Sequence, residues 1–127
     1  MTDQQTRLVE KARRALSTAR LVLDDGDVEG ALNRAYYACF YVAQALLLTY
    51  GEEPRTHRGV HHRFRERAVL PGLVPAELGR TLPYAASLRE RADYEAVTVT
   101  DTAGAADLLA DAHTFVDAVL RVLEKAE

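Results

Sequence analysis

The stretch between Gly30 and Gly51 constrains the fold most, because Arg34 is its only charged residue. On a helix, one row of apolar and aromatic side chains would follow this stretch from end to end: Leu32, Tyr36, Cys39, Ala43, Leu46 and Tyr50. Other aromatic residues fall on the remaining sides, so the helix must be covered on nearly every side. A four-helix bundle covers only about half of each helix. We therefore predict that the helix 27–50 also forms the interface of a homodimer.

The rest of the chain also favours helices. Its 127 residues include 21 alanines and 17 leucines, which are strong helix formers, and only four prolines and seven glycines. We expect helices over 2–24, 27–50, 56–69, 75–93 and 101–127, with the β-branched run 97–100 as a linker. Asp27 can cap the second helix, and Pro83 should kink or split the fourth. The prediction is one all-α domain over 1–127, an up-and-down four-helix bundle with one extra short helix.

Charge is unevenly distributed along the chain. The net charge of −3 excludes a uniformly basic nucleic-acid-binding protein, although a local basic patch remains compatible with it. Eight arginines face three glutamates over 55–92, whereas eight acidic residues face two basic ones over 93–127. Two interpretations stay open. These segments pair with each other inside the bundle, or some of the arginines line an anion site, because the forked guanidinium suits phosphate.

Two histidines of the basic segment would share one face of a short helix. His57 and His61 are four residues apart, which is the spacing of a metal-binding pair. Arg55 and Arg58 lie close to them in sequence and would repel a cation, so we expect no metal site. Anion binding by His57 and Arg58 is the functional interpretation, and surface or capping histidines are the structural one.

Several classes of protein are excluded by what the sequence lacks. Cys39 is the only cysteine, so there is no internal disulfide, and its aromatic surroundings suggest a small buried residue. No phosphate-binding loop, dinucleotide-binding glycine motif, serine nucleophile motif or Glu-x-x-His pair is found, and we expect no cofactor. The longest nearly apolar run, 35–48, is too short to span a bilayer. We expect a cytoplasmic protein with no membrane partner.

Four short motifs occur in a characteristic order: a Gly26-Asp27 turn, an Arg-Ala-Tyr-Tyr block at 34–37, Thr-His-x-Gly-Val at 56–60, and Leu-Arg-x-x-Ala-Asp-Tyr at 88–94. Each motif is weak alone. Together, over about residues 5–125, the sequence resembles the HEPN domain family. The likeness is to its small stand-alone bacterial and archaeal members, which are often encoded beside a minimal nucleotidyltransferase.

The resemblance implies a dimeric helical bundle, and in many members a metal-independent ribonuclease. Such members place an arginine and a histidine, four to six residues apart, in a cleft at the dimer interface. A tyrosine can replace the histidine in toxin–antitoxin members, and Arg89-x4-Tyr94 matches that variant. Asp93 lies between the two residues, and Arg91 is a second cation. We take Arg55-x5-His61, which also fits the spacing, as a chance match.

Geometry limits how Arg89 and Tyr94 could act together. On a continuous helix, five residues leave the two side chains about 140° apart, too far to meet on one phosphate. We therefore expect the helix to end near Asp93, with Tyr94 on a turn. Arg89 and Asp93, four residues apart, could pair on one face. Tyrosine is a poor general base at neutral pH, but it can donate or orient a proton.

Arg34 has two interpretations that the sequence does not separate. It could enter the same cleft and contact RNA, or it could be a buried structural arginine bonded to an acid of another helix.

The leading hypothesis is a HEPN toxin-like, metal-independent ribonuclease that acts as a homodimer. A nucleotidyltransferase antitoxin would control it, and the resemblance implies that this partner can modify the motif tyrosine, here Tyr94. The alternative is a non-catalytic HEPN subunit that binds a nucleotide or docks onto a nucleotidyltransferase.

Overall fold

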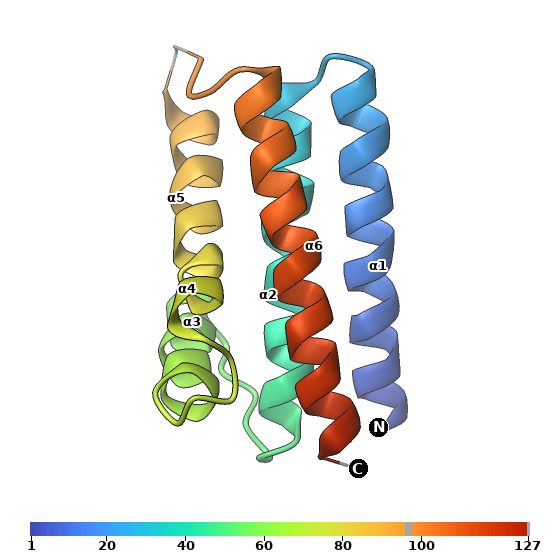
Figure 1. Cartoon of the computed structure of the whole chain (residues 1–127), viewed down its shortest axis with the longest axis vertical. Helices are drawn as coiled ribbons and strands as arrows, with labels where there is room; N and C mark the ends of the chain where they lie inside the picture. Colours follow the sequence, from blue (N-terminus) through green and yellow to red (C-terminus); the bar gives the residue numbers. More distant parts are fainter. Residues whose placement is uncertain (96–97, 127) are drawn as a thin grey trace.

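The computed structural model describes residues 1–95 and 98–126. Its elements are α1 (Asp3–Asp24), α2 (Val28–Leu48), α3 (His57–Phe64), the π-helical turn η1 (Arg65–Val69), α4 (Ala76–Gly79), α5 (Thr81–Tyr94) and α6 (Thr102–Lys125). The described residues form no strand, and α1, α2, α5 and α6 are the four longer helices (Figure 1). The predicted all-α bundle with an extra short helix is confirmed. Residues 98–101 between α5 and α6 are neither helix nor strand, and Val97 of the predicted linker lies outside the described residues.

Side-chain caps explain where the helices begin. The carboxylate of Asp27 accepts a hydrogen bond from the backbone nitrogen of Gly30 at 2.8 Å, as its position before α2 predicted. Thr56 and Asp101 accept the equivalent bonds at the starts of α3 and α6. These caps satisfy backbone donors that have no partner within the helix, so the short polar residues set the element boundaries.

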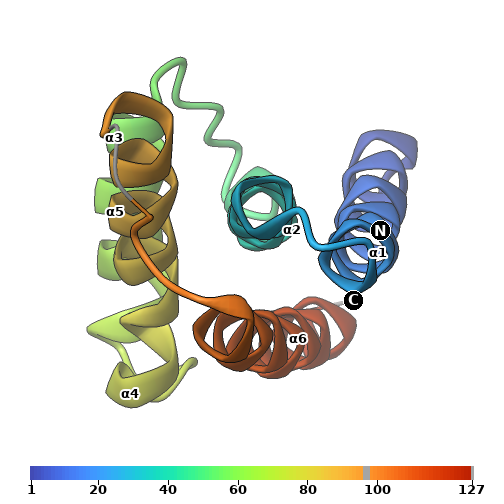
Figure 2. The same cartoon turned by 90° about the horizontal axis from the view of Figure 1, so that it is seen from above.

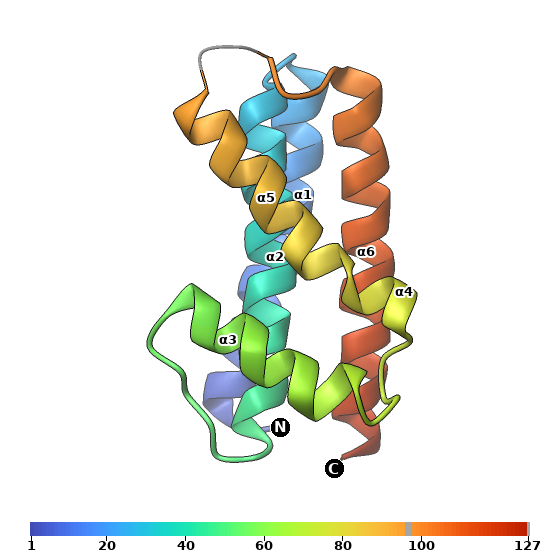
Figure 3. The same cartoon turned by 90° about the vertical axis from the view of Figure 1, so that its left-hand side faces the viewer.

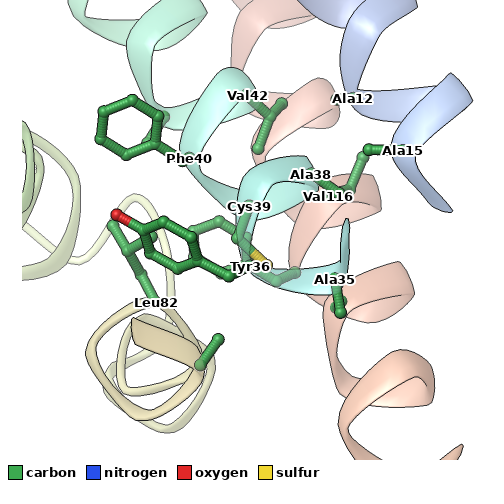
Figure 4. Close-up of a cluster of buried hydrophobic side chains, with 14 of the residues drawn as sticks. Ala12, Ala15, Ala35, Tyr36, Ala38, Cys39, Phe40, Val42, Leu82 and Val116 are labelled. Carbon is green, nitrogen blue, oxygen red and sulfur yellow. The ribbon is translucent and has the colours of Figure 1, made fainter. Parts of the chain in front are cut away.

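Helix α2 lies at the centre of the bundle, in contact with α1, α3, α5 and α6 (Figure 2). Its buried residues are Ala31, Leu32, Ala35, Tyr36, Ala38, Cys39, Phe40, Val42, Ala43, Ala45, Leu46 and Leu47. Figure 4 shows part of this core, with Leu82 of α5 beside Tyr36. Cys39 is a fully buried free cysteine as predicted, and burial raises the pKa of its thiol. Among the described helices, none is long and apolar enough to cross a membrane.

The premise that one chain covers about half of this central helix is corrected by the structure. Helices α3 and α5 cross α2 (Figure 3) and cover sides that a simple antiparallel bundle would leave open. What remains is a narrow stripe of half-buried side chains at spacings of three and four residues: Arg34, Tyr37, Tyr41, Gln44 and Leu48. The surface that α2 offers to a partner is therefore this stripe rather than half of the helix.

The fourth predicted helix is split, but not at Pro83. The break falls at Arg80, which ends α4 and precedes α5. Pro83 is the third residue of α5, where its missing N–H removes no hydrogen bond within the helix. The proline is thus compatible with the first turn of a new helix, and the chain changes direction before it.

Gln5, a buried polar side chain, joins the start of α1 to the end of α2. Its Nε2 donates to the carbonyl oxygen of Ala45 and to Oγ1 of Thr49, both at 3.0 Å. Its Oε1 accepts from the backbone nitrogen of Thr2 at 2.9 Å.

We expect Gln5→Met to lower the free energy of unfolding by about 1–3 kcal/mol, because it leaves these groups unpaired. Urea denaturation measures the change. Gln4→Met is the matched control, because Gln4 is exposed, and it should cost at most about 0.5 kcal/mol. Equal losses for the two variants would contradict the assignment of Gln5 as the anchor.

Candidate active site

Arg89 of α5 lies against the central helix rather than in solvent. Its guanidinium carbon is 4.8 Å from the ring centroid of Tyr36 and 5.7 Å from that of Tyr37. Its Nη1 donates to Oδ2 of Asp93 at 3.3 Å, which is the pairing that the sequence suggested. The Nε of Arg89 is buried and has no hydrogen-bond partner. The motif arginine therefore lies against two tyrosine rings and pairs with Asp93, and its Nη2 is also 4.0 Å from Oε1 of Glu90.

The hydroxyl of Tyr36 connects two histidines of α3 to this arginine. It lies 2.8 Å from Nδ1 of His57 and 3.0 Å from Nε2 of His61. The four-residue spacing places both imidazoles on the face of α3 that packs against α2. Tyr36 is fully buried, so its hydroxyl depends on these partners for hydrogen bonding.

Burial lowers the pKa of both histidines. For His57, burial has the largest effect, the positive charge of Arg89 adds to it, and Glu90 opposes it. For His61, burial is again first, followed by the neighbouring His57. Burial raises the pKa of Tyr36 well above its ordinary value, although Arg89 opposes the shift. At neutral pH the cluster thus combines two neutral imidazoles, a protonated tyrosine and a permanent cation.

A single hydroxyl proton determines how the three groups can bond. Tyr36 can donate to only one neutral histidine, so it must accept an N–H from the other. If His57 Nδ1–H donates to Tyr36 and Tyr36 donates to His61 Nε2, then Nε2 of His57 carries a free lone pair. His57 is the more exposed of the two rings, so that lone pair is available to a ligand as a base.

Aromatic packing fixes the ring of His57. The Phe40 ring stacks on it with 4.2 Å between centroids, and Tyr37 meets it edge-on at 5.8 Å. Phe40 and Tyr36 come from one side of α2, so the helix that forms the core also orients the histidine. A rigid imidazole next to an arginine is well suited to acid–base chemistry on a bound phosphodiester.

The structure separates Tyr94 from this cluster. Tyr94 is the last residue of α5 rather than a turn residue, so the helix ends one position later than expected, and 87% of Tyr94 is exposed. Arg91 is also exposed, with its Nε 3.2 Å from Oε1 of Glu95. Within one chain, Asp93 joins Arg89, whereas Tyr94 and Arg91 do not.

The remaining predicted cations have different surroundings. The Nε of Arg34 donates to Oδ1 of Asn33 at 3.0 Å, and its guanidinium lies 5.2 Å from the centre of the Tyr37 ring. No ion pair to an acid of another helix is found for Arg34 in the part of the chain that the structure describes. Arg58 is exposed on α3, beside the two histidines.

The basic segment is only partly neutralised, and among the described residues the acidic C-terminal segment contributes only where the two segments meet, through Asp93 with Arg89 and Glu95 with Arg91. Arg63 and Arg67 both bind the carboxylate of Glu52, the latter at 2.6 Å, and these bonds lower the pKa of Glu52. Glu66 binds Arg63 at 2.5 Å and His62 at 2.8 Å. Thus neither sequence interpretation holds for the whole segment: some arginines pair with nearby carboxylates, whereas Arg58, Arg65 and Arg80 form no ion pair within the described residues.

Tyr36 and His61 were not among the site residues predicted from the sequence. The spacing of His57 and His61 was the available signal, because it placed both rings on one face. Nothing in the sequence showed that a tyrosine 21 residues before His57 would bond to both rings. Among the described residues, no group of three or more His, Cys, Asp or Glu side chains is arranged to hold a metal ion.

Comparisons with known proteins agree with this fold. The family model described as HEPN domain matches residues 5–123. A protein of Methanocaldococcus jannaschii, named as a candidate toxin, is 34% identical over 118 residues, covering 93% of this chain and 87% of that protein. A UPF0332 protein of Thermotoga maritima is 33% identical over 114 residues, covering 90% and 86% respectively. A chain from the crystal structure of a toxin–antitoxin with AMP-PNP superposes with a TM-score of 0.65 at 18% identity, covering 94% of this chain and 99% of that one.

The lowered histidine pKa values make folding stability depend on pH. In the unfolded chain both histidines have a pKa near 6.5, so below that pH the unfolded state binds more protons than the folded state. We expect the free energy of unfolding to fall as pH drops below about 6.5, until the folded-state pKa values are passed.

Urea denaturation between about pH 7.5 and about pH 5.5 measures this loss. The double variant His57→Gln/His61→Gln should lose less stability than wild type, and His62→Gln should follow wild type. Parallel curves for wild type and the double variant would contradict the proposed burial of the pair.

Proposed function

The chain belongs to the HEPN domain family, and we propose that it is a toxin-type ribonuclease that cuts RNA without a metal ion. One observation carries this proposal: Arg89 shares a site with two neutral histidines that are bridged by the hydroxyl of Tyr36. A phosphate-binding cation beside a neutral imidazole is the combination that cleavage by an internal 2′-hydroxyl requires.

The reaction would be a transesterification. His57 Nε2 takes the proton of the ribose 2′-hydroxyl, and the 2′ oxygen forms a bond to the adjacent phosphorus. The bond from phosphorus to the 5′ oxygen breaks, and that oxygen takes a proton from Tyr94. The products are a 2′,3′-cyclic phosphate and a 5′-hydroxyl, and His57 returns its proton to the Tyr94 phenolate through solvent.

Each group of the cluster has a role in this scheme. Arg89 stabilises the negative charge on the non-bridging phosphate oxygens through its positive charge and its Nη2 donors, because Asp93 binds Nη1. Tyr36 accepts from Nδ1–H of His57 and so stabilises the imidazolium that forms. Arg34, Arg58 and Arg91 would contact the RNA backbone.

The active form would be a homodimer through the helix 27–50. The half-buried stripe on α2, from Arg34 to Leu48, supports this part of the proposal. At its far end, Gln44 and Leu48 line a cavity of about 570 Å³ together with Leu8 of α1. Pairing two such stripes would cover Tyr37 and Tyr41 and bring together the two copies of the Arg89 cluster. Within one chain, the side chains of Tyr94 and Arg89 point in different directions. In the dimer, Tyr94 would face a shared cleft.

A nucleotidyltransferase antitoxin would hold the activity in check by modifying Tyr94. The exposure of Tyr94, at 87%, leaves its hydroxyl accessible to a modifying enzyme. The solved structure of similar fold is a toxin–antitoxin with AMP-PNP, which supports a nucleotide-dependent partner.

The alternative is a non-catalytic module that binds a nucleotide or docks onto a nucleotidyltransferase. Its support is that Arg89 and Tyr94 do not converge within one chain, and that Asp93 already occupies part of the guanidinium. Binding without cleavage would favour this function.

Cleavage of a labelled mixed-sequence RNA in EDTA tests the ribonuclease proposal. We expect Arg89→Ala to lower kcat by about 10²–10³-fold, and His57→Ala by about 10²–10⁴-fold, with cyclic phosphate ends on the wild-type products. Arg121→Ala, an exposed arginine on α6, is the matched control and should cut like wild type. Equal rates for wild type and Arg89→Ala would contradict the assigned site.

Light scattering at micromolar concentration tests the dimer. We expect wild type to be dimeric and Tyr41→Arg to be monomeric, because the substitution places a charge in the middle of the α2 stripe. Leu21→Arg changes an exposed residue of α1 and should leave the dimer intact. A monomeric wild type would contradict the shared cleft.

A further inference from the structure

A second cavity lies beside α3. Its volume is about 610 Å³, which is within the range of small-ligand sites. It lies between α3, η1, α4 and the start of α5, which face one another in Figure 3. Residues on its wall include Arg58, His61, Arg65, Val69, Arg80 and Pro83.

The floor of the cavity is apolar. Phe64 and Leu82 lie beneath it, each 1% exposed, and Val69 and Pro83 provide the more accessible apolar side chains. Leu70, at the edge, is 62% exposed and extends the apolar surface. A flat apolar group could cover this surface.

Unusual backbone structure forms one wall. The π-helical turn η1 is closed by a bond of 2.9 Å from the backbone nitrogen of Leu70 to the carbonyl oxygen of Arg65. Such turns are rare and often occur at functional sites. Opposite it, a Cβ on Gly79 would lie 2.6 Å from Cγ2 of Val69, so glycine is needed for α4 to approach this closely.

Three cations on the rim have no counter-ion. Arg58, Arg65 and Arg80 form no ion pair within the described residues, although Arg63 and Arg67 of the same segment are paired with Glu52. Glu66, the acid nearest in sequence, is occupied by Arg63 and His62. Three uncompensated guanidinium groups around an apolar floor favour a ligand that is both anionic and flat.

His61 connects this cavity to the proposed active site. Its Nε2 bonds to the Tyr36 hydroxyl, while its ring also forms part of the cavity wall. The imidazole of His61 would therefore separate a ligand in the cavity from Tyr36 and His57.

We propose that this cavity binds one nucleotide of the RNA, with its base against the apolar floor and its phosphate on Arg65 and Arg80. The nucleotide would be a neighbour of the one that is cut, which makes the cavity a determinant of RNA sequence preference. That placement in the RNA rests on the proposed function, whereas nucleotide binding itself does not. A cavity of about 610 Å³ suits a single base and phosphate better than an extended acidic peptide.

Calorimetric titration with adenosine, uridine, cytidine and guanosine 3′-monophosphates tests the binding directly. We expect at least one nucleotide to bind, and Arg65→Gln or Arg80→Gln to weaken its binding about tenfold or more, because each removes a charge-assisted contact. Arg14→Gln, an exposed arginine of α1, is the control and should bind like wild type. Ala76→Leu, which places a larger side chain at the wall, should also weaken binding without removing a charge.

Three results would overturn the proposal. Nucleotide affinity unchanged in Arg65→Gln and Arg80→Gln would place the ligand elsewhere. Inorganic phosphate binding as tightly as the nucleotides would show an anion site with no role for the apolar floor. An acidic octapeptide that displaces the nucleotides and binds more tightly than any of them would identify a protein-docking site instead.

Cleavage assays separate a failure of this proposal from a failure of the proposed function. We expect Arg65→Gln and Arg80→Gln to raise KM for a short RNA about tenfold, and Arg89→Ala to lower kcat by about 10²–10³-fold while nucleotide affinity stays intact. If wild type does not cut RNA but binds nucleotides through Arg65 and Arg80, the ribonuclease proposal is wrong and the cavity stands. If wild type cuts RNA with a KM that neither variant changes, the ribonuclease stands and the cavity assignment is wrong.

Discussion

The hydrogen bonds of the Tyr36 hydroxyl are the interaction on which the candidate site depends. A phenol buried at the centre of an apolar helix must find partners inside the protein, and His57 and His61 supply them at 2.8 and 3.0 Å. The same contacts dock α3 onto α2 and place both imidazoles beside Arg89. The tyrosine ring in turn supports the guanidinium, so one residue positions the acid–base groups and the cation together.

Burial and electrostatics set the protonation states of the groups in this site. Burial, with a smaller effect of Arg89, lowers the pKa of both histidines, so these rings are neutral and can act as bases near neutral pH. Asp93 binds Nη1 of the guanidinium and Nε is buried, so the proposed phosphate contact of Arg89 depends on Nη2. The core residues that surround the site are rigidly packed, which limits the reorganisation needed when a phosphodiester binds.

Local features were predictable from the sequence, and long-range ones were not. Asp27 and the apolar periodicity indicated the helices, and the four-residue spacing indicated the Arg89–Asp93 pair, because these depend on neighbouring residues. The covering of α2 by α3 and α5, and the bonds from Tyr36 across 21 and 25 residues, depend on tertiary packing. The break at Arg80 was misplaced at Pro83 because a proline is acceptable in a first helical turn.

The most direct test of this account is NMR observation of the imidazole nitrogens of His57 and His61 across the pH range. We expect both rings to titrate below pH 6.5 and to share one tautomer at neutral pH, with the proton on Nδ1, so that His57 donates to the Tyr36 hydroxyl and His61 accepts from it. The Tyr36→Phe variant should abolish this shared preference. Two histidines that titrate near pH 6.5, with tautomers unchanged by Tyr36→Phe, would contradict it.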